Sequence, residues 1–223
     1  MINEKWKIFI VIPAYNEASV IADTIRDVRK YYENIIVADD GSSDATGNAA
    51  EAAGAVVLRH IINRGQGAAL RTGINYALEQ DADVIITYDA DGQFEASEIE
   101  KLSQPIISEE CDAVLGSRFL SGNKIPLLKK LILIPAILFT RAITGLNLTD
   151  THNGFRAMSR EAAEKINIRQ DRMAHASEIV HEIARLGLKY KEIPITVKYT
   201  AYSKHKGQRL AGAFHILFDL IFK

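Results

Sequence analysis

The chain has 223 residues, of which 48% are hydrophobic and 25% are charged, with 27 Lys and Arg against 28 Asp and Glu. A chain of this length buries roughly 70% of the surface that its unfolded form exposes, which excludes a wholly disordered protein or one that needs disulfides or metals to fold. The net charge of −1 argues against nucleic-acid binding through bulk positive charge, and the single cysteine excludes an internal disulfide and favours a reducing, cytoplasmic compartment.

The first half of the chain alternates predicted strands with predicted helices. Short apolar runs rich in β-branched residues predict strands, and apolar residues at helical spacing predict helices between them. The predicted strands are residues 7–13, 35–39, 55–60, 83–89 and 112–117, and the predicted helices are 18–32, 44–53, 67–79 and one that begins near residue 95. Strands that are apolar throughout and separated by helices predict an α/β fold with a mostly parallel sheet covered on both faces.

The second half is less regular. Its predicted elements are an amphipathic helix over 126–145 interrupted at Pro135, a helix over 177–186, an extended segment over 190–199 and a final helix over 210–222. The longest uninterrupted apolar stretch, 131–139, is far shorter than the about 20 residues of a membrane-spanning helix, so we expect none. The first apolar run is interrupted by Pro13 and Asn16 too early for a signal peptide.

Two segments of the second half contain bases and no acids. Residues 113–149 hold five Lys or Arg, and residues 193–218 hold four. Such clustering can arise by chance on a solvated surface. It also fits a positive surface that meets anionic lipid headgroups or phosphate.

A pair of aspartates marks the end of the fourth predicted strand. Asp89 and Asp91 follow it directly, and Gln93 stands two residues further on. Parallel sheets bind ligands at the carboxyl ends of their strands, and carboxylate and amide oxygens are the ligands that Mg²⁺ and Mn²⁺ prefer. Two aspartates in a turn are common in proteins that bind no ligand there. The prediction of a metal site therefore rests on the position of the pair at the end of a strand.

A second acidic turn ends the second predicted strand. A turn explains Gly41, and a helix N-cap explains the residues from Ser42 to Asp44. Neither explains why an acid, Asp39, stands at the end of the strand. Asp39 could accept a hydrogen bond from the N–H of a nucleotide base. The residues from Pro13 to Glu17, which end the first strand, would stand next to it.

Six motifs then occur in the order seen in family 2 glycosyltransferases. They are IPAYNEA, VADDGSSDAT, NRGQGAALRTG, DADGQ, GSRF and DTHNGFRAM. From about residue 8 to 209 the chain resembles most the subgroup of dolichyl- and polyprenyl-phosphate sugar synthases. The resemblance implies a GT-A fold in a single domain over 1–223, with a nucleotide-sugar-binding half over about 7–118, a smaller acceptor- and membrane-facing half over about 119–223, and inversion at the sugar carbon.

The resemblance also implies which residues form the site. Those expected to bind the nucleotide sugar are Pro13, Tyr15, Glu17, Asp39, Asp89, Ala90, Asp91 and Arg118. The expected ligands of Mg²⁺ or Mn²⁺ are Asp89, Asp91 and Gln93. The residues expected to bind the acceptor phosphate are Arg118, Arg156, Lys204, Lys206 and Arg209, with Asn153 to Phe155 beside them. The expected catalytic residues are Asp91, Arg118 and Glu178.

The nature of the acceptor follows from what the motifs lack. Many family members that use hydroxyl acceptors carry a Glu-Asp pair and a Gln-x-x-Arg-Trp motif, which this chain lacks, since its only tryptophan is Trp6. A sugar hydroxyl needs a positioned base, whereas a lipid monophosphate is largely dianionic at pH 7 and can attack directly. Glu178 is the candidate base if the acceptor is a hydroxyl, and otherwise it and Glu182 simply face solvent on a helix.

We therefore expect a metal-dependent enzyme that moves a hexose from a UDP- or GDP-sugar to a polyprenyl phosphate, peripherally on the cytoplasmic face of the membrane and with a small membrane protein as a plausible partner. Two alternatives stay open: transfer to a sugar hydroxyl in polysaccharide synthesis, and a non-catalytic protein that binds nucleotide sugars. A Rossmann dehydrogenase is a weak rival because NRGQG lacks the third glycine of the dinucleotide fingerprint.

Overall fold

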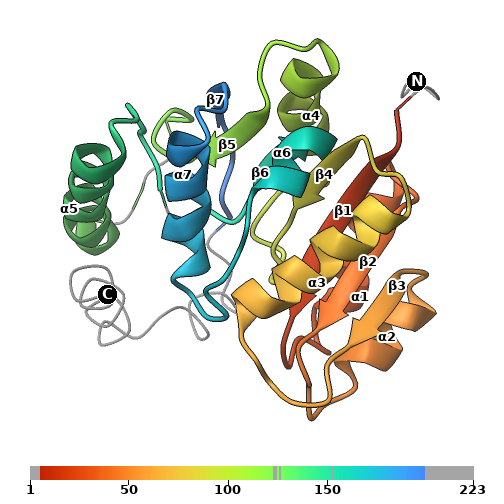
Figure 1. The fold of residues 1–223 in the computed structure, drawn as a ribbon. Coiled ribbons are helices and arrows are strands. Elements are labelled where there is room, and N and C mark those ends of the chain that lie inside the picture. The colour runs from red at the N-terminus through yellow and green to blue at the C-terminus, as the bar shows by residue number, and fades with distance from the viewer. Residues whose placement is uncertain (1–5, 123–124, 126, 152, 199–223) are drawn as a thin grey trace.

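A computed structural model describes residues 6–122, 125, 127–151 and 153–198. Its centre is a seven-stranded sheet with the strand order β3-β2-β1-β4-β6-β5-β7. Figure 1 shows helices on both faces of this sheet, with α5 at the side far from β3. The predicted fold class is confirmed in its main features: a mixed α/β protein built around one mostly parallel sheet.

The strands of the first half form the parallel part of the sheet. They are β1 (Ile8–Ala14), β2 (Ile35–Asp39), β3 (Val56–Arg59) and β4 (Val84–Thr87). Beyond them lie β6 (Arg156–Ser159), β5 (Ala113–Ser117) and β7 (Tyr190–Pro194). Strand β6 runs antiparallel to both β4 and β5, while β7 pairs with β5 in parallel. The sequence pattern did not predict β6, because its four residues include no run of β-branched side chains.

Eight helical segments connect the strands in the described part of the chain. They are α1 (Ile21–Arg29), α2 (Thr46–Ala52), α3 (Gln66–Glu79), the short 3₁₀ segment η1 (Ala96–Glu98), α4 (Ile99–Ile107), α5 (Leu127–Thr144), α6 (Arg160–Lys165) and α7 (His175–Arg185). The sequence did not predict α6. The predicted final helix over 210–222 lies outside the described residues.

Helix α5 continues through Pro135, where the sequence predicted an interruption. A proline inside a helix removes one N–H and leaves the carbonyl four residues earlier without its partner. Pro135 and Leu131, whose carbonyl is affected, both lie on the exposed side of α5. Water can satisfy that carbonyl there, so the helix is not forced to end. Among the described residues, no helix is both long and apolar enough to cross a membrane.

The apolar core lies on both faces of the sheet. Because successive side chains of a strand point to opposite faces, Ile10 packs with Ile21 and Ile25 of α1, whereas Val11 packs with Leu70 and Ile74 of α3. Burial of both faces explains why the central strands are apolar throughout. It also leaves the carboxyl ends of the strands as the place where polar residues can gather.

Candidate functional site

The loop after β4 carries the DAD sequence and is anchored from several sides. The hydroxyl of Tyr88 donates to the carbonyl of Phe94 at 2.8 Å, and the hydroxyl of Thr24 on α1 donates to the carbonyl of Ala90 at 2.9 Å. The rings of Tyr88, Phe94 and Phe155 pack together with centroid distances of 4.9 to 5.6 Å. The loop that holds Asp89 and Asp91 is therefore held in one conformation by buried contacts.

The three predicted metal ligands lie together on this loop. The main-chain N–H of Gln93 donates to Oδ1 of Asp91 at 3.1 Å, and its side-chain amide donates to the other oxygen of the same carboxylate. Oδ1 of Asp89 accepts a hydrogen bond of 3.3 Å from the side-chain amide of Gln66, at the start of α3. Glu17, after β1, is buried and acts electrostatically on both aspartates.

Burial disfavours negative charge at this site. It raises the pKa of Asp89 to about 7, helped by the charges of Asp91 and Glu17 and opposed by those of Arg156 and Arg118. The pKa of Asp91 is also raised, chiefly by burial, although its hydrogen bonds with Gln93 oppose the shift. A cation near two such carboxylates would stabilise their charged forms.

The donor set fits Mg²⁺ or Mn²⁺. The described residues contain no cluster of three His, Cys, Asp or Glu side chains able to hold a metal ion. Two carboxylates and the amide oxygen of Gln93 would instead leave coordination positions for substrate phosphate oxygens and water, which is typical of Mg²⁺ sites. These hard oxygen donors suit the two metals equally.

The residues predicted to hold the nucleoside gather at the ends of β1 and β2. Pro13 pairs with Ala38, and Ala14 with Asp39, so Asp39 and Tyr15 follow neighbouring strands at the same edge. The side chain of Tyr15 is partly exposed, whereas Asp39 is buried and its Oδ1 accepts the main-chain N–H of Ser42 at 3.0 Å. Asp39 thus stabilises its own turn, and its contact with a nucleotide base stays a prediction.

Asp40 has a role that the sequence did not predict. Its carboxylate accepts hydrogen bonds from the main-chain N–H groups of Arg64 (2.9 Å) and Gly65 (2.6 Å), and it lies 2.7 Å from Nδ1 of His60. These bonds fix the loop that enters α3 and so place Gln66 beside Asp89. The second acid of the DDGSSD turn is therefore a structural clamp behind the site.

Arg118 is brought to the site but is already paired. It follows β5, and its Nε and Nη2 donate to Oδ2 (2.6 Å) and Oδ1 (3.1 Å) of Asp150, whose side chain is fully buried. The charge of Arg118 lowers the pKa of Asp89, so the two are close enough to interact. A contact between Arg118 and phosphate stays a prediction, and Asp150 is a functional candidate that the sequence analysis missed.

Arg156 differs from a residue that meets phosphate at an open surface. Its side chain is 3% exposed, and it donates to the main-chain carbonyls of Asn153 (2.9 Å), Thr151 (3.2 Å) and Ala176 (3.0 Å). Burial lowers its pKa to about 10, while the charge of Asp89 opposes that shift. Arg156 therefore ties Thr151 and Asn153 to Ala176 on α7, and its charge acts on Asp89.

Glu178 lies in the first turn of α7 and does not simply face solvent. Its Oε2 accepts the main-chain N–H groups of Arg169 (3.0 Å) and Gln170 (2.9 Å). The loop so held packs on the start of α3, where Ala68 donates to the carbonyl of Asp171 at 3.1 Å. Glu182 instead pairs with Arg185. These contacts show a structural role for Glu178 and leave its role as a base a prediction.

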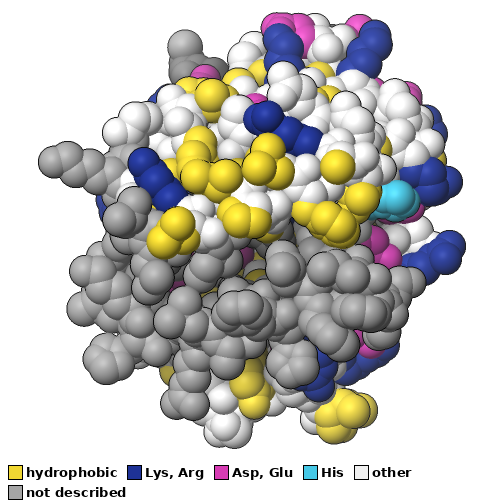
Figure 2. All heavy atoms as spheres, turned by 90° about the vertical axis from the view of Figure 1, so that its left-hand side faces the viewer, with side chains coloured by type: hydrophobic (Ala, Val, Ile, Leu, Met, Phe, Trp, Pro, Cys, Tyr) yellow, Lys and Arg dark blue, Asp and Glu magenta, His cyan; other side chains and the backbone are white. Residues whose placement is uncertain are grey.

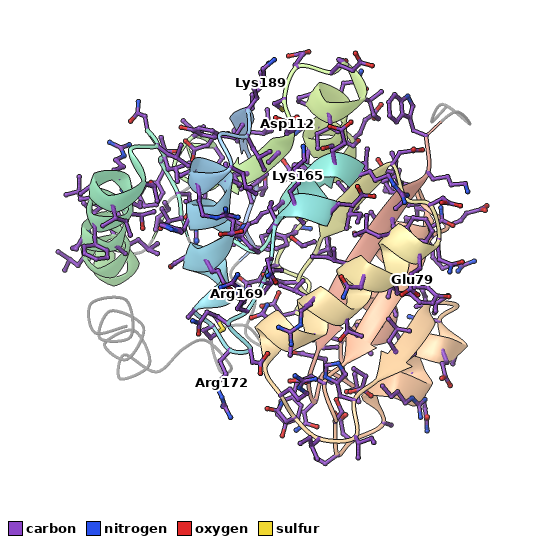
Figure 3. All side chains as sticks on the ribbon, in the orientation of Figure 1. Glu79, Asp112, Lys165, Arg169, Arg172 and Lys189 are labelled. Atoms are coloured by element: carbon purple, nitrogen blue, oxygen red, sulfur yellow. The ribbon has the colours of Figure 1, made fainter. Side chains whose placement is uncertain are left out.

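The loop that joins α6 to α7 adds positive charge that the sequence analysis did not single out. Figure 3 shows Arg169 and Arg172 on this loop, with Arg172 pointing away from the ribbon. Both side chains are exposed.

The described chain ends beside the DAD loop. The main-chain N–H of Lys198 donates to the carbonyl of Gln93 at 2.8 Å, and that of Thr196 donates to the buried carboxylate of Glu98 at 2.8 Å. Lys198 also pairs with Glu95 at 3.3 Å. The predicted phosphate ligands Lys204, Lys206 and Arg209 lie outside the described residues.

Comparison with solved structures concerns the fold. The structure of glucosyl-3-phosphoglycerate synthase from Mycobacterium tuberculosis superposes with a TM-score of 0.76 over 97% of this chain and 78% of that one, at 20% identity. Another structure of that protein, with Mn²⁺ and UDP-glucose bound, also gives a TM-score of 0.76. This likeness confirms the expected GT-A fold.

Comparison by sequence reaches the family. The chain is 42% identical to an uncharacterised protein of Methanocaldococcus jannaschii, over 99% of this chain and 94% of that protein. It is 32% identical to the UDP-N-acetylglucosamine–dolichyl-phosphate N-acetylglucosaminyltransferase of Methanococcus voltae (96% and 94%) and 31% identical to the undecaprenyl-phosphate mannosyltransferase of Micrococcus luteus (85% and 83%). Residues 9–167 match the family model described as glycosyl transferase family 2. The chain therefore belongs to glycosyl transferase family 2 and is a glycosyltransferase.

Proposed function

We propose that this glycosyltransferase moves a hexose from a UDP- or GDP-sugar to a polyprenyl phosphate, using Mg²⁺ or Mn²⁺. The observation that carries the proposal is the half-buried pair Asp89 and Asp91 at the end of β4, with the pKa of Asp89 raised to about 7 and Arg118 close by. Such a site disfavours its own charge until a cation arrives. The Methanococcus voltae and Micrococcus luteus relatives are a dolichyl-phosphate and an undecaprenyl-phosphate transferase, which supports a lipid-phosphate acceptor here.

The chemistry assigned to the site is one in-line displacement. Asp89, Asp91 and Gln93 would hold the metal ion, which when bound neutralises charge that develops on the leaving nucleoside diphosphate. Pro13, Tyr15, Glu17 and Asp39 would hold the nucleoside at the neighbouring strand ends. An oxygen of the acceptor phosphate attacks the anomeric carbon as the bond from that carbon to the diphosphate breaks, with inversion. Arg118 and the basic loop 204–209 would orient the acceptor phosphate.

An outer face of α5 supports association with the membrane surface that holds the acceptor. Leu131, Ile134 and Leu138 are exposed on this helix, at 65%, 45% and 57%. Figure 2 shows apolar side chains gathered on the side of the molecule that carries α5. Basic residues near an anionic surface contribute about 1 kcal/mol each, so Lys130 and Arg141 would add to the apolar contact. We place the enzyme peripherally on the cytoplasmic face of a membrane, where a small membrane protein could assist it.

The test is a transfer assay with the purified protein. UDP- and GDP-sugars with a labelled hexose are incubated with Mn²⁺ or Mg²⁺, with and without undecaprenyl phosphate in detergent. We expect label in an organic-soluble, mild-acid-labile product that forms only with the lipid and the metal, and Asp91→Ala should abolish it. Donor binding without any transfer to the lipid contradicts the proposal.

The variant Glu178→Gln separates the two kinds of acceptor. A phosphate acceptor needs no base, so this variant should keep near-normal turnover with undecaprenyl phosphate. Loss of turnover with donor binding intact would instead favour a sugar hydroxyl as acceptor. Because Gln still offers an oxygen to the N–H groups of Arg169 and Gln170, the loop should remain folded.

A further inference from the structure

Glu192 on β7 is a half-buried carboxylate that binds the loop before the NGFR segment. Its Oε1 accepts hydrogen bonds from the main-chain N–H of Thr149 (2.9 Å), the hydroxyl of Thr149 (3.0 Å) and the main-chain N–H of Asp150 (3.0 Å). Its Oε2 lies 2.8 Å from the same Thr149 nitrogen. Hydrogen bonds from backbone N–H groups to an ionised carboxylate are stronger than those between neutral groups. Glu192 therefore fixes the backbone of two consecutive loop residues.

The loop that Glu192 holds in turn holds Arg118. Asp150 accepts two hydrogen bonds from the guanidinium of Arg118 and a third from its main-chain N–H at 3.2 Å. The hydroxyls of Thr149 and Ser117, the residues that precede this pair, lie 2.6 Å apart. The chain of contacts runs without a gap from Glu192 through Thr149 and Asp150 to Arg118.

The sheet register sets the two ends of this chain of contacts. In the parallel pairing of β5 with β7, Leu115 is opposite Glu192 and Ser117 is opposite Pro194. Arg118 directly follows Ser117, the last residue of β5, and its positive charge lowers the pKa of Asp89. Two neighbouring strands thus place the guanidinium beside the DAD loop.

A bidentate Arg–carboxylate pair adds geometric specificity only if the carboxylate itself is fixed. Asp150 lies in the segment between α5 and β6, whose described residues form no strand pairing before Arg156. The bonds from Glu192 restrain the main chain at Thr149 and Asp150 directly. A displacement of about 1 Å in a positioning group can reduce catalysis by roughly 100-fold, so such a restraint has a large effect on an oriented reaction.

We propose that Glu192 is a positioning residue of the transferase: by holding Thr149 and Asp150, it sets where the Arg118 guanidinium meets the acceptor phosphate. This inference rests on the proposed transfer to a polyprenyl phosphate. Glu192 itself acts through Asp150 and Arg118.

The kinetic test compares Glu192→Gln with Glu110→Gln. Glu110 pairs with Lys191 on the exposed surface, so the control removes a nearby carboxylate without touching the loop. Both carboxylate oxygens of Glu192 face the main-chain N–H of Thr149, so the NH₂ group of a Gln must face that donor in either orientation, which is not the case at Glu178. Glu192→Gln should therefore raise the KM for undecaprenyl phosphate about tenfold, with the KM for the donor changed less than twofold. The control should behave as wild type. An unchanged KM for the lipid overturns the proposal. A fall in kcat together with a lower Tm, with the KM values of lipid and donor both unchanged, overturns it as well.

A milder variant guards against a folding defect. Thr149→Val removes only the hydroxyl bonds to Glu192 and Ser117 and leaves the main-chain N–H groups in place. Its KM for the lipid should rise in the same direction and by less than that of Glu192→Gln. An unchanged KM in Thr149→Val together with a destabilised Glu192→Gln would count against positioning.

A second measurement separates this inference from the proposed function. Phenylglyoxal modifies free guanidinium groups, and peptide mass spectrometry reports the rate at Arg118 without any acceptor lipid. Arg118 should react faster in Glu192→Gln than in wild type or Glu110→Gln. If the wild type does not transfer to the lipid, the proposed function fails while this rate still tests the restraint, and an unchanged rate overturns it.

Discussion

Asp89 is the side chain whose charge the fold disfavours most clearly at the site. Its pKa is raised to about 7, chiefly by burial, from an ordinary value near 3.9. Between those two pH values the folded state binds a proton that the unfolded state releases. Stability is therefore lost as pH rises through this window, and the loss is nearly complete by about pH 8.

The variant Asp89→Asn should test how much the ionised Asp89 carboxylate destabilises the folded state. Because it removes the disfavoured charge, the donor-free variant should melt several degrees higher than wild type at pH 8, with a smaller gain at pH 5, while transfer falls at least about 100-fold. Thermal melts at the two pH values measure the effect. The exposed Asp23→Asn should show no comparable pH dependence, and a lower Tm for Asp89→Asn at pH 8 would contradict the assignment.

Gly154 supplies a second test at the same carboxylate. A Cβ at this position would lie 2.5 Å from Oδ1 of Asp89, which is too close for any real contact. Gly154→Ala should therefore displace Asp89 and lower metal-dependent turnover by about tenfold or more. At Gly73 the atoms nearest to an added Cβ belong to Val11 in the core, at 2.4 Å. Gly73→Ala should lower the Tm and leave the KM values of the folded fraction unchanged. The same result for Gly154→Ala would contradict this prediction.

At the scale of elements, α5 carries apolar side chains on two sides. One of these sides is exposed, because no other described residue packs against it. The other side is buried through residues such as Ala136, Ile137 and Thr140, so the helix is anchored to the protein. Singly exposed apolar residues are ordinary, but three on one helical stripe form a contact surface.

The double variant Leu131→Glu/Leu138→Glu should weaken binding to vesicles that contain anionic lipid. Two exposed substitutions leave the buried side of α5 unchanged, so the Tm should shift little while the fraction that sediments with vesicles falls several-fold. Turnover with a short, water-soluble polyprenyl phosphate should be retained. Unchanged sedimentation would assign this face to something other than a lipid surface.

At the scale of the whole molecule, the site joins segments that only the native sheet brings together. The DAD loop, the end of β1, the start of α3 and the end of β5 are contributed by distant parts of the sequence. A ligand that bridges them binds the folded state alone and must stabilise it.

Donor binding should therefore raise the melting temperature of the entire chain. At a UDP concentration 100 times its Kd in the presence of Mn²⁺, the stabilisation is about 2.7 kcal/mol, or roughly 5–10 °C for a chain of this size. Neither UDP nor Mn²⁺ alone should give the full shift, and Asp91→Ala should remove the metal-dependent part. A full shift with UDP and a metal chelator would show that the nucleotide binds without the metal.

The sequence by itself determined the parallel part of the fold and the outline of the site. The strand 35–39 is apolar up to its last residue, Asp39, which predicts burial on both faces of the sheet. A parallel sheet then brings Asp39 and Asp89 to one edge. The pairing of β6 could not be predicted, because a four-residue strand between two neighbours is selected by long-range contacts and has little local pattern. The continuation of α5 through Pro135 depended on solvent exposure of one carbonyl, which no local pattern shows.

Only the tertiary structure decided how charges are paired. Asp40, Asp150 and Glu192 are ordinary acids in the sequence, and their roles follow from partners 20 to 43 residues away. In the same way Arg156, which the motif alone suggested for phosphate, is enclosed by main-chain carbonyls of the fold. Hydrogen bonding and burial depend on three-dimensional neighbours, whereas apolar periodicity is local, and this difference sets what could be predicted from the sequence of this protein.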